Sequence, residues 1–278
     1  MSSDYSAAVS TARDYYNSDD ADNFYFTIWG GEDIHVGLYQ SDDEPIFDAS
    51  RRTVERMSSK VAKLDESTTV LDLGAGYGGA ARYLAATYGC KVVALNLSEV
   101  ENERDRQMNR EQGLDHLIEV VDGSFDKVAY PDASFDVIWS QDAILHSDNR
   151  TGVMEEASRL LKSGGEMVFT DPMQADDCPE GVLQPILDRI HLQSLGSPGF
   201  YRKTAVSLGM EDLGFEDHSA QLPRHYGRVL KETEKHDAEL SKVVSRDYIE
   251  RMKKGLQHWV DGGHNGYLAW GIFHFRKP

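Results

Sequence analysis

The chain has 278 residues, a formal net charge of −18 and the apolar content of an ordinary globular protein. This length suits one large α/β domain, and we expect residues 1–278 to form a single domain. The acidic surface argues against a nucleic-acid partner, because phosphate binding needs a basic footprint, and it disfavours docking on anionic lipid. Surplus acid is typical of salt-adapted, halophilic proteins, although simple solubility explains it as well.

The chain contains neither an apolar run long enough to cross a bilayer nor the N-terminal pattern of a secretion signal. Its two cysteines, Cys90 and Cys178, suggest neither a disulfide framework nor a CxxC metal motif. We therefore expect a cytoplasmic protein with no membrane partner and no metal site. Because no apolar surface helix is obvious, we also expect a monomer.

The N-terminal segment, residues 1–62, is expected to fold as a helical lid over a binding site. Its expected elements, in chain order, are a helix over 4–17, a polar break over 18–24, an aromatic and glycine-rich ordered loop over 23–39, and a helix over 46–63. The break is inferred from the run SDDADNF, whose polar residues interrupt the apolar pattern.

Residues 63–175 alternate short apolar strands with helices in a regular rhythm and are expected to bind a cofactor. Strands are expected over 68–74, 91–98, 116–124, 134–142 and 164–173, and the helices between them end near residues 88, 112 and 162. Such alternation predicts an α/β fold with a doubly wound, Rossmann-like sheet of parallel strands. Its ligands should lie beyond the carboxyl ends of the strands.

The remaining residues, 176–278, are less regular and are expected to form a substrate-side helical insertion and the last strands of a seven-stranded sheet. Helices are expected over 179–197, 202–209 and 227–261, and strands over 214–222 and 267–278. The helix over 227–261 is long and charged along its whole length.

The segment VLDLGAGYGG, residues 70–79, joins a buried strand to a helix through a glycine turn. Gly74, Gly76 and Gly79 satisfy the pattern GxGxxG, which by itself also fits a nicotinamide or flavin dinucleotide. Asp72 argues against a dinucleotide, because its carboxylate would oppose a pyrophosphate lying over the turn. S-adenosylmethionine instead carries an ammonium and a sulfonium, which a carboxylate attracts. We therefore expect S-adenosylmethionine as the cofactor, with glycines that let it approach the backbone closely.

Further residues at successive strand ends are expected to line the same cofactor site. They are Asn96, Leu97, Asp122, Gly123, Ser124 and Gln141. Asn96 is expected to face the ribose hydroxyls, where this fold prefers an acid, and Asp122 begins the turn expected to hold adenine. Asn, Asp, Gly and Ser are also ordinary turn or cap formers. Their recurrence at three strand ends favours a nucleoside ligand.

The fourth strand runs into Asp142 and His146, at the edge expected to face the transferred methyl group. If a helical turn starts there, the two side chains share a face, because positions i and i+4 are neighbours on a helix. A histidine near a methyl donor can orient an acceptor amine or take its proton. The alternative is that Asp142 caps a helix and His146 is an ordinary loop residue.

Aromatic residues in the lid segment offer a means of recognising a cationic amine. Tyr25, Phe26, Trp29 and His35 precede the sheet, where the chain can fold over the cofactor. Aromatic faces stabilise cations most effectively when both are removed from water, so a cage here would suit an ammonium product. The alternative is ordinary lid packing, which we favour for Phe26.

A close resemblance to the sarcosine/dimethylglycine N-methyltransferases of betaine synthesis is carried by the segments WSQDAILHS, TDPM, LQPILDRI, GSPGFYR and LQHWVDGG. This resemblance implies an S-adenosylmethionine-dependent enzyme that converts sarcosine to N,N-dimethylglycine and N,N-dimethylglycine to glycine betaine. Glycine betaine is an osmolyte, which agrees with the acidic composition.

A more distant likeness is to the phosphoethanolamine methyltransferases, which pair a lid tyrosine with a histidine after the fourth strand. The segments FYFTIWG and QDAILH match those motifs, which carries the catalytic roles to Tyr25 and His146. The substrate-side aspartate of that family falls on Asp142. Its phosphate-binding aromatic and lysine positions fall near His225 or Tyr226, and on His274. The missing lysine argues against a phosphobase substrate.

An amino-acid substrate also needs a partner for its carboxylate. Arg202, in GSPGFYR, is the candidate, because arginine binds carboxylates through two parallel hydrogen bonds. Tyr201, Arg224 and His225 are the alternatives for this role. Arg202 would otherwise form an ion pair on a helix surface.

Three functions stay open from the sequence. The first is an amino-acid N-methyltransferase that transfers the methyl group directly, with His146 taking the amine proton and Asp142 orienting the amine. The second is a methyltransferase for phosphoethanolamine or another small metabolite, and the third is a protein that binds the cofactor without catalysis.

Overall fold

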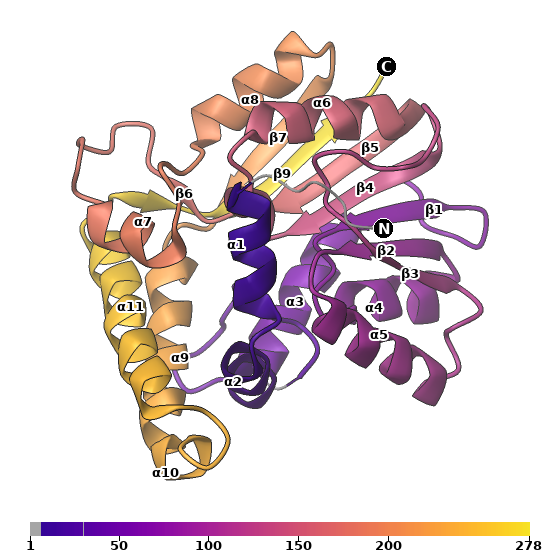
Figure 1. Cartoon of the computed structure of the whole chain (residues 1–278). Helices are drawn as coiled ribbons and strands as arrows, with labels where there is room; N and C mark the ends of the chain where they lie inside the picture. The colour runs from indigo at the N-terminus through magenta and orange to yellow at the C-terminus, as the bar shows by residue number, and fades with distance from the viewer. Residues whose placement is uncertain (1–6, 30) are drawn as a thin grey trace.

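The computed structural model describes residues 7–29 and 31–278 of the chain (Figure 1). Its central sheet has seven strands in the order β3-β2-β1-β4-β5-β9-β7. These strands are β1 (Thr69–Leu73), β2 (Lys91–Asn96), β3 (Ile118–Asp122), β4 (Phe135–Gln141), β5 (Leu161–Thr170), β7 (Glu211–Asp217) and β9 (Gly271–Arg276). Only β9 runs antiparallel to its neighbours β5 and β7. The predicted α/β, doubly wound fold is therefore confirmed.

Helices cover both faces of this sheet, which explains why the central strands are apolar on both sides. The helices that connect the parallel strands are α4 (Gly79–Tyr88), α5 (Glu99–Glu111) and α6 (Arg150–Leu160). On one face, α4 and α3 (Ile46–Ser58) pack on a cluster that includes Trp139. On the other face, α6 and α8 (Pro198–Ser207) pack on a cluster that includes Phe169 and Phe273.

Side chains that accept a hydrogen bond from a backbone N–H mark where several helices begin. Ser98, Asn149, Ser197 and Ser245 each cap the N-terminus of a helix in this way. At α8 the cap is followed by Pro198, which suits a first helical position. The helix expected over 202–209 therefore starts earlier than predicted.

The predicted polar break over 18–24 is wrong, because a second helix begins there. Helix α1 (Ala7–Tyr16) is followed at once by α2 (Asp19–Trp29), and residues 4–6 of the predicted first helix lie outside the described residues. Ser18 Oγ accepts a hydrogen bond from the N–H of Ala21, and three aspartates occupy the first turn of α2. Acidic groups there favour the helix, since its N-terminus carries partial positive charge.

The predicted unbroken helix over 227–261 is also wrong. The chain forms α9 (Gln221–Lys235), the short α10 (Asp237–Leu240) and α11 (Arg246–His264). The turn between them brings Leu240 and Val244 into an apolar cluster with Phe24 of α2. Burying these side chains favours two packed helices over one extended, charged helix.

The insertion between β5 and α8 contains less helix than predicted over 179–197. Its helix α7 (Gln184–Ile190) is short, and it follows β6 (Met173–Gln174), which pairs with β8 (Leu268–Ala269). In Figure 1, α7, α9, α10 and α11 gather at the left, away from the edge strand β3 at the right, with α1 between these two parts. None of the described helices is both long and apolar enough to cross a membrane.

Candidate active site

Two adjoining pockets lie between the carboxyl ends of the parallel strands and the surrounding helices. The first, here called the strand-edge pocket, is lined by Val9, Tyr16, Ile34, Gly74, Gly76, Asn96, Leu97, Glu101, Gly123, Ser124, Phe125, Gln141, Asp142, Ala143, His146 and Ser147. The second, here called the aromatic pocket, has walls from the lid, α7, α9 and α11. Its polar and aromatic lining includes Tyr15, Tyr16, Tyr25, Trp29, His35, Asp142, His146, Arg189, His225, Tyr226 and Trp259.

The glycine turn after β1 forms part of the strand-edge pocket. Gly74 and Gly76 have φ angles of +80° and +55°, which favour glycine over other residues. A Cβ atom on Gly74 would lie only 2.4 Å from the Cβ of Ala143. The turn therefore depends on glycine both for its backbone conformation and for its close approach to the end of β4.

Most residues predicted to line the cofactor site are brought together in the strand-edge pocket, but Asp72 and Asp122 are not among its lining residues. Asp122 is exposed at the end of β3, where it pairs with Arg106 at 2.9 Å. Asp72 is buried at the end of β1. Burial and the nearby carboxylates of Asp105 and Asp33 raise the pKa of Asp72 to about 8.

Glu101 lines the strand-edge pocket and was missed by the sequence reasoning. Its carboxylate accepts a hydrogen bond of 2.9 Å from the side-chain amide of Asn96, at the end of β2. Burial raises the pKa of Glu101 to about 7, although the bond from Asn96 acts in the opposite direction. This fold prefers an acidic residue at the end of the second strand, where this chain has Asn96. Here the carboxylate comes instead from Glu101, in the first turn of α5. The spacing of Ser98 and Glu101 is typical of a capping box, and this pattern in the sequence could have drawn attention to Glu101.

His146 lies in a single helical turn, Ile144–His146, and lines both pockets. Burial, with smaller contributions from Arg150 and Arg189, lowers its pKa to about 4, so the imidazole is neutral near pH 7. Its Nε2 atom lies 3.0 Å from the hydroxyl of Tyr16. The phenol paired with His146 is therefore Tyr16 rather than Tyr25.

Tyr25 also lines the aromatic pocket, but its hydroxyl lies 3.2 Å from that of Tyr15. Its ring packs against Trp29, with the two ring centroids 5.0 Å apart. Phe26 is exposed and lies under the guanidinium of Arg104, which agrees with the packing role favoured for it.

Asp142 also lines both pockets, although it does not share a helix with His146 as one prediction supposed. Its φ of +52° turns the chain sharply after β4. One carboxylate oxygen accepts hydrogen bonds from Thr170 and Trp270, at 2.7 and 2.8 Å, and the other accepts one from the N–H of Val36 at 2.7 Å. Burial raises the pKa of Asp142, while these donors oppose the shift.

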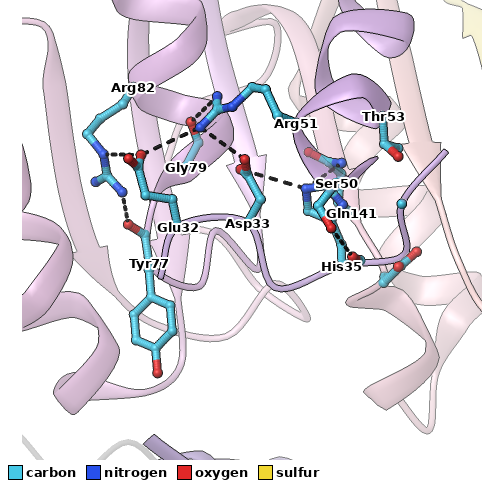
Figure 2. A network of polar contacts seen from close by, with 12 residues as sticks. Glu32, Asp33, His35, Ser50, Arg51, Thr53, Tyr77, Gly79, Arg82 and Gln141 are labelled. Atoms are coloured by element: carbon cyan, nitrogen blue, oxygen red, sulfur yellow. Dashed lines mark hydrogen bonds and ion pairs between the residues drawn. The ribbon is translucent and has the colours of Figure 1, made fainter. Parts of the chain in front are cut away.

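Ion pairs hold the loop that follows α2 against the glycine turn (Figure 2). Arg82, at the start of α4, contacts Glu32 at 3.1 Å, and Arg51 of α3 contacts Asp33 at 2.9 Å. His35, two residues on, lies 3.0 Å from the side-chain amide of Gln141 at the end of β4. The loop that carries His35 and Ile34 is therefore tied to the same strand ends that line the strand-edge pocket.

Two predicted substrate residues lie away from both pockets. Arg202 is exposed on α8 and forms an ion pair with Asp212 at 2.6 Å. Tyr201 is buried in the core, where its hydroxyl donates a hydrogen bond of 2.6 Å to Asp171. Both are therefore withdrawn as contacts for a substrate carboxylate. The alternative Arg224 also lies outside the aromatic pocket and pairs with Asp42.

Residues 71–169 match the family model described as a methyltransferase domain. Over 97% of this chain and 97% of the relative, the sequence is 68% identical to a sarcosine/dimethylglycine N-methyltransferase of Halorhodospira halochloris. The chain belongs to the sarcosine/dimethylglycine N-methyltransferase family. A second relative with the same name, from Aphanothece halophytica, is 57% identical over 98% of each chain.

The fold of this family is also seen in a solved structure. The crystal structure described as that of a putative sarcosine dimethylglycine methyltransferase from Galdieria sulphuraria superposes with a TM-score of 0.90. The two chains are 44% identical, and the match covers 95% of this chain and 98% of the other. The family resemblance inferred from the sequence is confirmed.

Proposed function

We propose that this protein transfers methyl groups from S-adenosylmethionine to sarcosine and then to N,N-dimethylglycine, forming glycine betaine. The observation that carries this proposal is the junction of the two pockets, where Tyr16, Ile34, Asp142 and His146 line both. A methyl donor in one pocket and an amine in the other therefore meet at a single point. The names of the relatives support the choice of acceptor.

The residues of the strand-edge pocket fit S-adenosylmethionine, which supplies an activated methyl group when bound. Gly74 and Gly76 leave space for its amino-acid end, and Gly123 borders the space for the adenine. The carboxylate of Glu101 would accept hydrogen bonds from the ribose hydroxyls. An ammonium held at the turn would favour the ionised form of Asp72.

The aromatic pocket fits a small amine. Its rings can stabilise a methylated ammonium, and Asp142 places negative charge where the pockets meet. The substrate amine must lose its proton before it attacks a methyl group. The neutral imidazole of His146 would accept that proton, while Tyr16 holds the ring in position. Otherwise the protein aligns the reactants and excludes water.

A substrate panel with radiolabelled S-adenosylmethionine tests this function. We expect label to enter sarcosine and N,N-dimethylglycine, with none entering phosphoethanolamine. Transfer to phosphoethanolamine without transfer to either amino acid would contradict the proposal. Cofactor binding in calorimetry with no transfer to any amine would instead indicate a binding protein.

The substitution Glu101→Gln tests the donor site. The loss of hydrogen bonds to a charged acceptor, which contribute about 1.5–3 kcal/mol, should weaken S-adenosylmethionine binding by about tenfold or more. In the native protein, affinity should rise from pH 6 to pH 8, because ribose hydroxyls bind the ionised carboxylate and its pKa is about 7. Calorimetry should find that this rise is lost in the variant.

Glu103→Gln is the matched control, since Glu103 lies on the same helix but pairs with Arg110 at the surface. It should leave both the affinity and its pH dependence unchanged. Equal affinity in native protein and Glu101→Gln would remove Glu101 from the donor site.

A further inference from the structure

Arg189, in the last turn of α7, lines the aromatic pocket without an acidic partner among the described residues. Its guanidinium donates to the thioether sulfur of Met252 at 2.7 Å, and no ion pair to a described carboxylate accompanies that contact. Sulfur is a weak acceptor that carries no charge. Arg189 is half-buried, so its guanidinium is partly removed from water without a counter-ion, which is costly and suggests an anion supplied from outside the chain.

Helix α11 is shaped to leave room for this side chain. A Cβ atom on Gly255 would lie 2.1 Å from both Cδ and Nε of Arg189. Glycine inside a helix lowers helix stability relative to alanine, so its presence at this contact needs a compensating reason. The space it leaves allows the guanidinium to lie against the helix beside the pocket.

Arg189 lines the aromatic pocket but not the strand-edge pocket, which is the proposed place of the methyl donor. Asp142 and His146, by contrast, line both pockets. Arg189 also lines an outer hollow between α7 and α11. A ligand that spans the aromatic pocket would therefore have one end at the junction with the donor and the other at a cation.

Two uncharged groups in the aromatic pocket also favour a ligand that accepts hydrogen bonds. The Nε1 atom of Trp29 and the Nε2 atom of His225 are buried with no hydrogen-bond partner among the described residues, and both residues line the same pocket. The Nδ1 atom of His225 accepts from the N–H of Gly37, which leaves the proton of a neutral ring on Nε2. Both nitrogen atoms are therefore hydrogen-bond donors without an acceptor among the described residues.

We infer that Arg189 binds the carboxylate of the amino-acid substrate and thereby holds its amine at the junction of the two pockets. The inference rests on the proposed function and identifies the residue that selects amino acids over amines without a carboxylate. An α-amino acid has the required pattern, with its cationic amine and its carboxylate separated by one carbon. Arg202, the sequence-based candidate, is already paired with Asp212.

Steady-state kinetics of Arg189→Gln with N,N-dimethylglycine tests the inference. The KM should rise about 100-fold or more, because a charge-assisted bidentate contact is lost, while the affinity for S-adenosylmethionine stays unchanged. Arg189→Lys keeps the charge without the bidentate geometry, so its KM should lie between that of the native enzyme and that of Arg189→Gln. Gly255→Ala should also raise KM, because the added methyl group displaces the guanidinium without removing it.

Arg202→Gln is the matched control and should leave KM unchanged. A folded Arg189→Gln enzyme that binds S-adenosylmethionine and keeps a native KM would overturn the inference. If Arg189→Gln does not fold, the same criterion applies to Arg189→Lys and Gly255→Ala. Failure of the proposed function is distinguishable, because the unaltered enzyme would then methylate neither sarcosine nor N,N-dimethylglycine.

Discussion

His146→Ala is expected to lower kcat by about 10²–10⁴-fold, the range typical of removing a positioned acid or base. The variant loses the only imidazole among the described residues that lines both pockets, and with it the group proposed to accept the amine proton. The dissociation constant of S-adenosylmethionine should change far less than kcat. Single-turnover kinetics and calorimetry on the same preparation separate these two effects.

Two tyrosine variants serve as a matched pair for this prediction. Tyr16→Phe removes the hydroxyl that lies 3.0 Å from His146, whereas Tyr25→Phe removes one that lies near Tyr15. We expect the larger loss of kcat for Tyr16→Phe, because only its hydroxyl contacts the imidazole directly. A kcat that survives His146→Ala would exclude His146 from the proton transfer.

Gly74→Ala is expected to abolish measurable binding of S-adenosylmethionine and to lower the free energy of unfolding. A non-glycine residue in the left-handed region costs about 1–2 kcal/mol. The added methyl would also lie 2.4 Å from the Cβ of Ala143, a contact that neither backbone can avoid without moving. The turn must therefore shift where it borders the strand-edge pocket.

Gly113→Ala is the matched control, because it introduces backbone strain without the steric clash expected in Gly74→Ala. Gly113 has a φ of +68°, and a Cβ atom there meets nothing within 4 Å. Thermal unfolding should show a modest loss of stability, while calorimetry should show native affinity for the cofactor. Native affinity in Gly74→Ala would mean that the turn does not form part of the donor site.

Much of the fold follows from local patterns in the sequence. Apolar runs predicted the five strands of the central sheet that lie in residues 63–175, because a strand covered by helices on both faces has to be apolar on both sides. The glycines of the turn after β1 predicted the place of the strand-edge pocket, since the carboxyl ends of parallel strands lie together. Even the family resemblance rests on short contiguous segments.

The errors in helix boundaries had two causes, one local and one that depends on tertiary packing. The polar run at Asp19 begins a helix because its acids lie at the positive helix end. The charged segment after residue 227 breaks because Leu240 and Val244 gain a buried position by turning inward. Charge content alone did not reveal either outcome, because the first depends on where the acids lie within the helix and the second on which side chains lie opposite in space.

The partners of the candidate site were decided by tertiary structure. From the sequence, Tyr25 and Arg202 were the natural choices, yet Tyr16 contacts His146, and Arg189 lines the aromatic pocket. Glu101 reaches the end of β2 from the following helix. A residue type and its spacing determine which element carries a side chain, but contacts between distant segments depend on how those elements pack. The sequence therefore determined the glycine turn and the strands around it, whereas only the packed helices decided which side chains meet there.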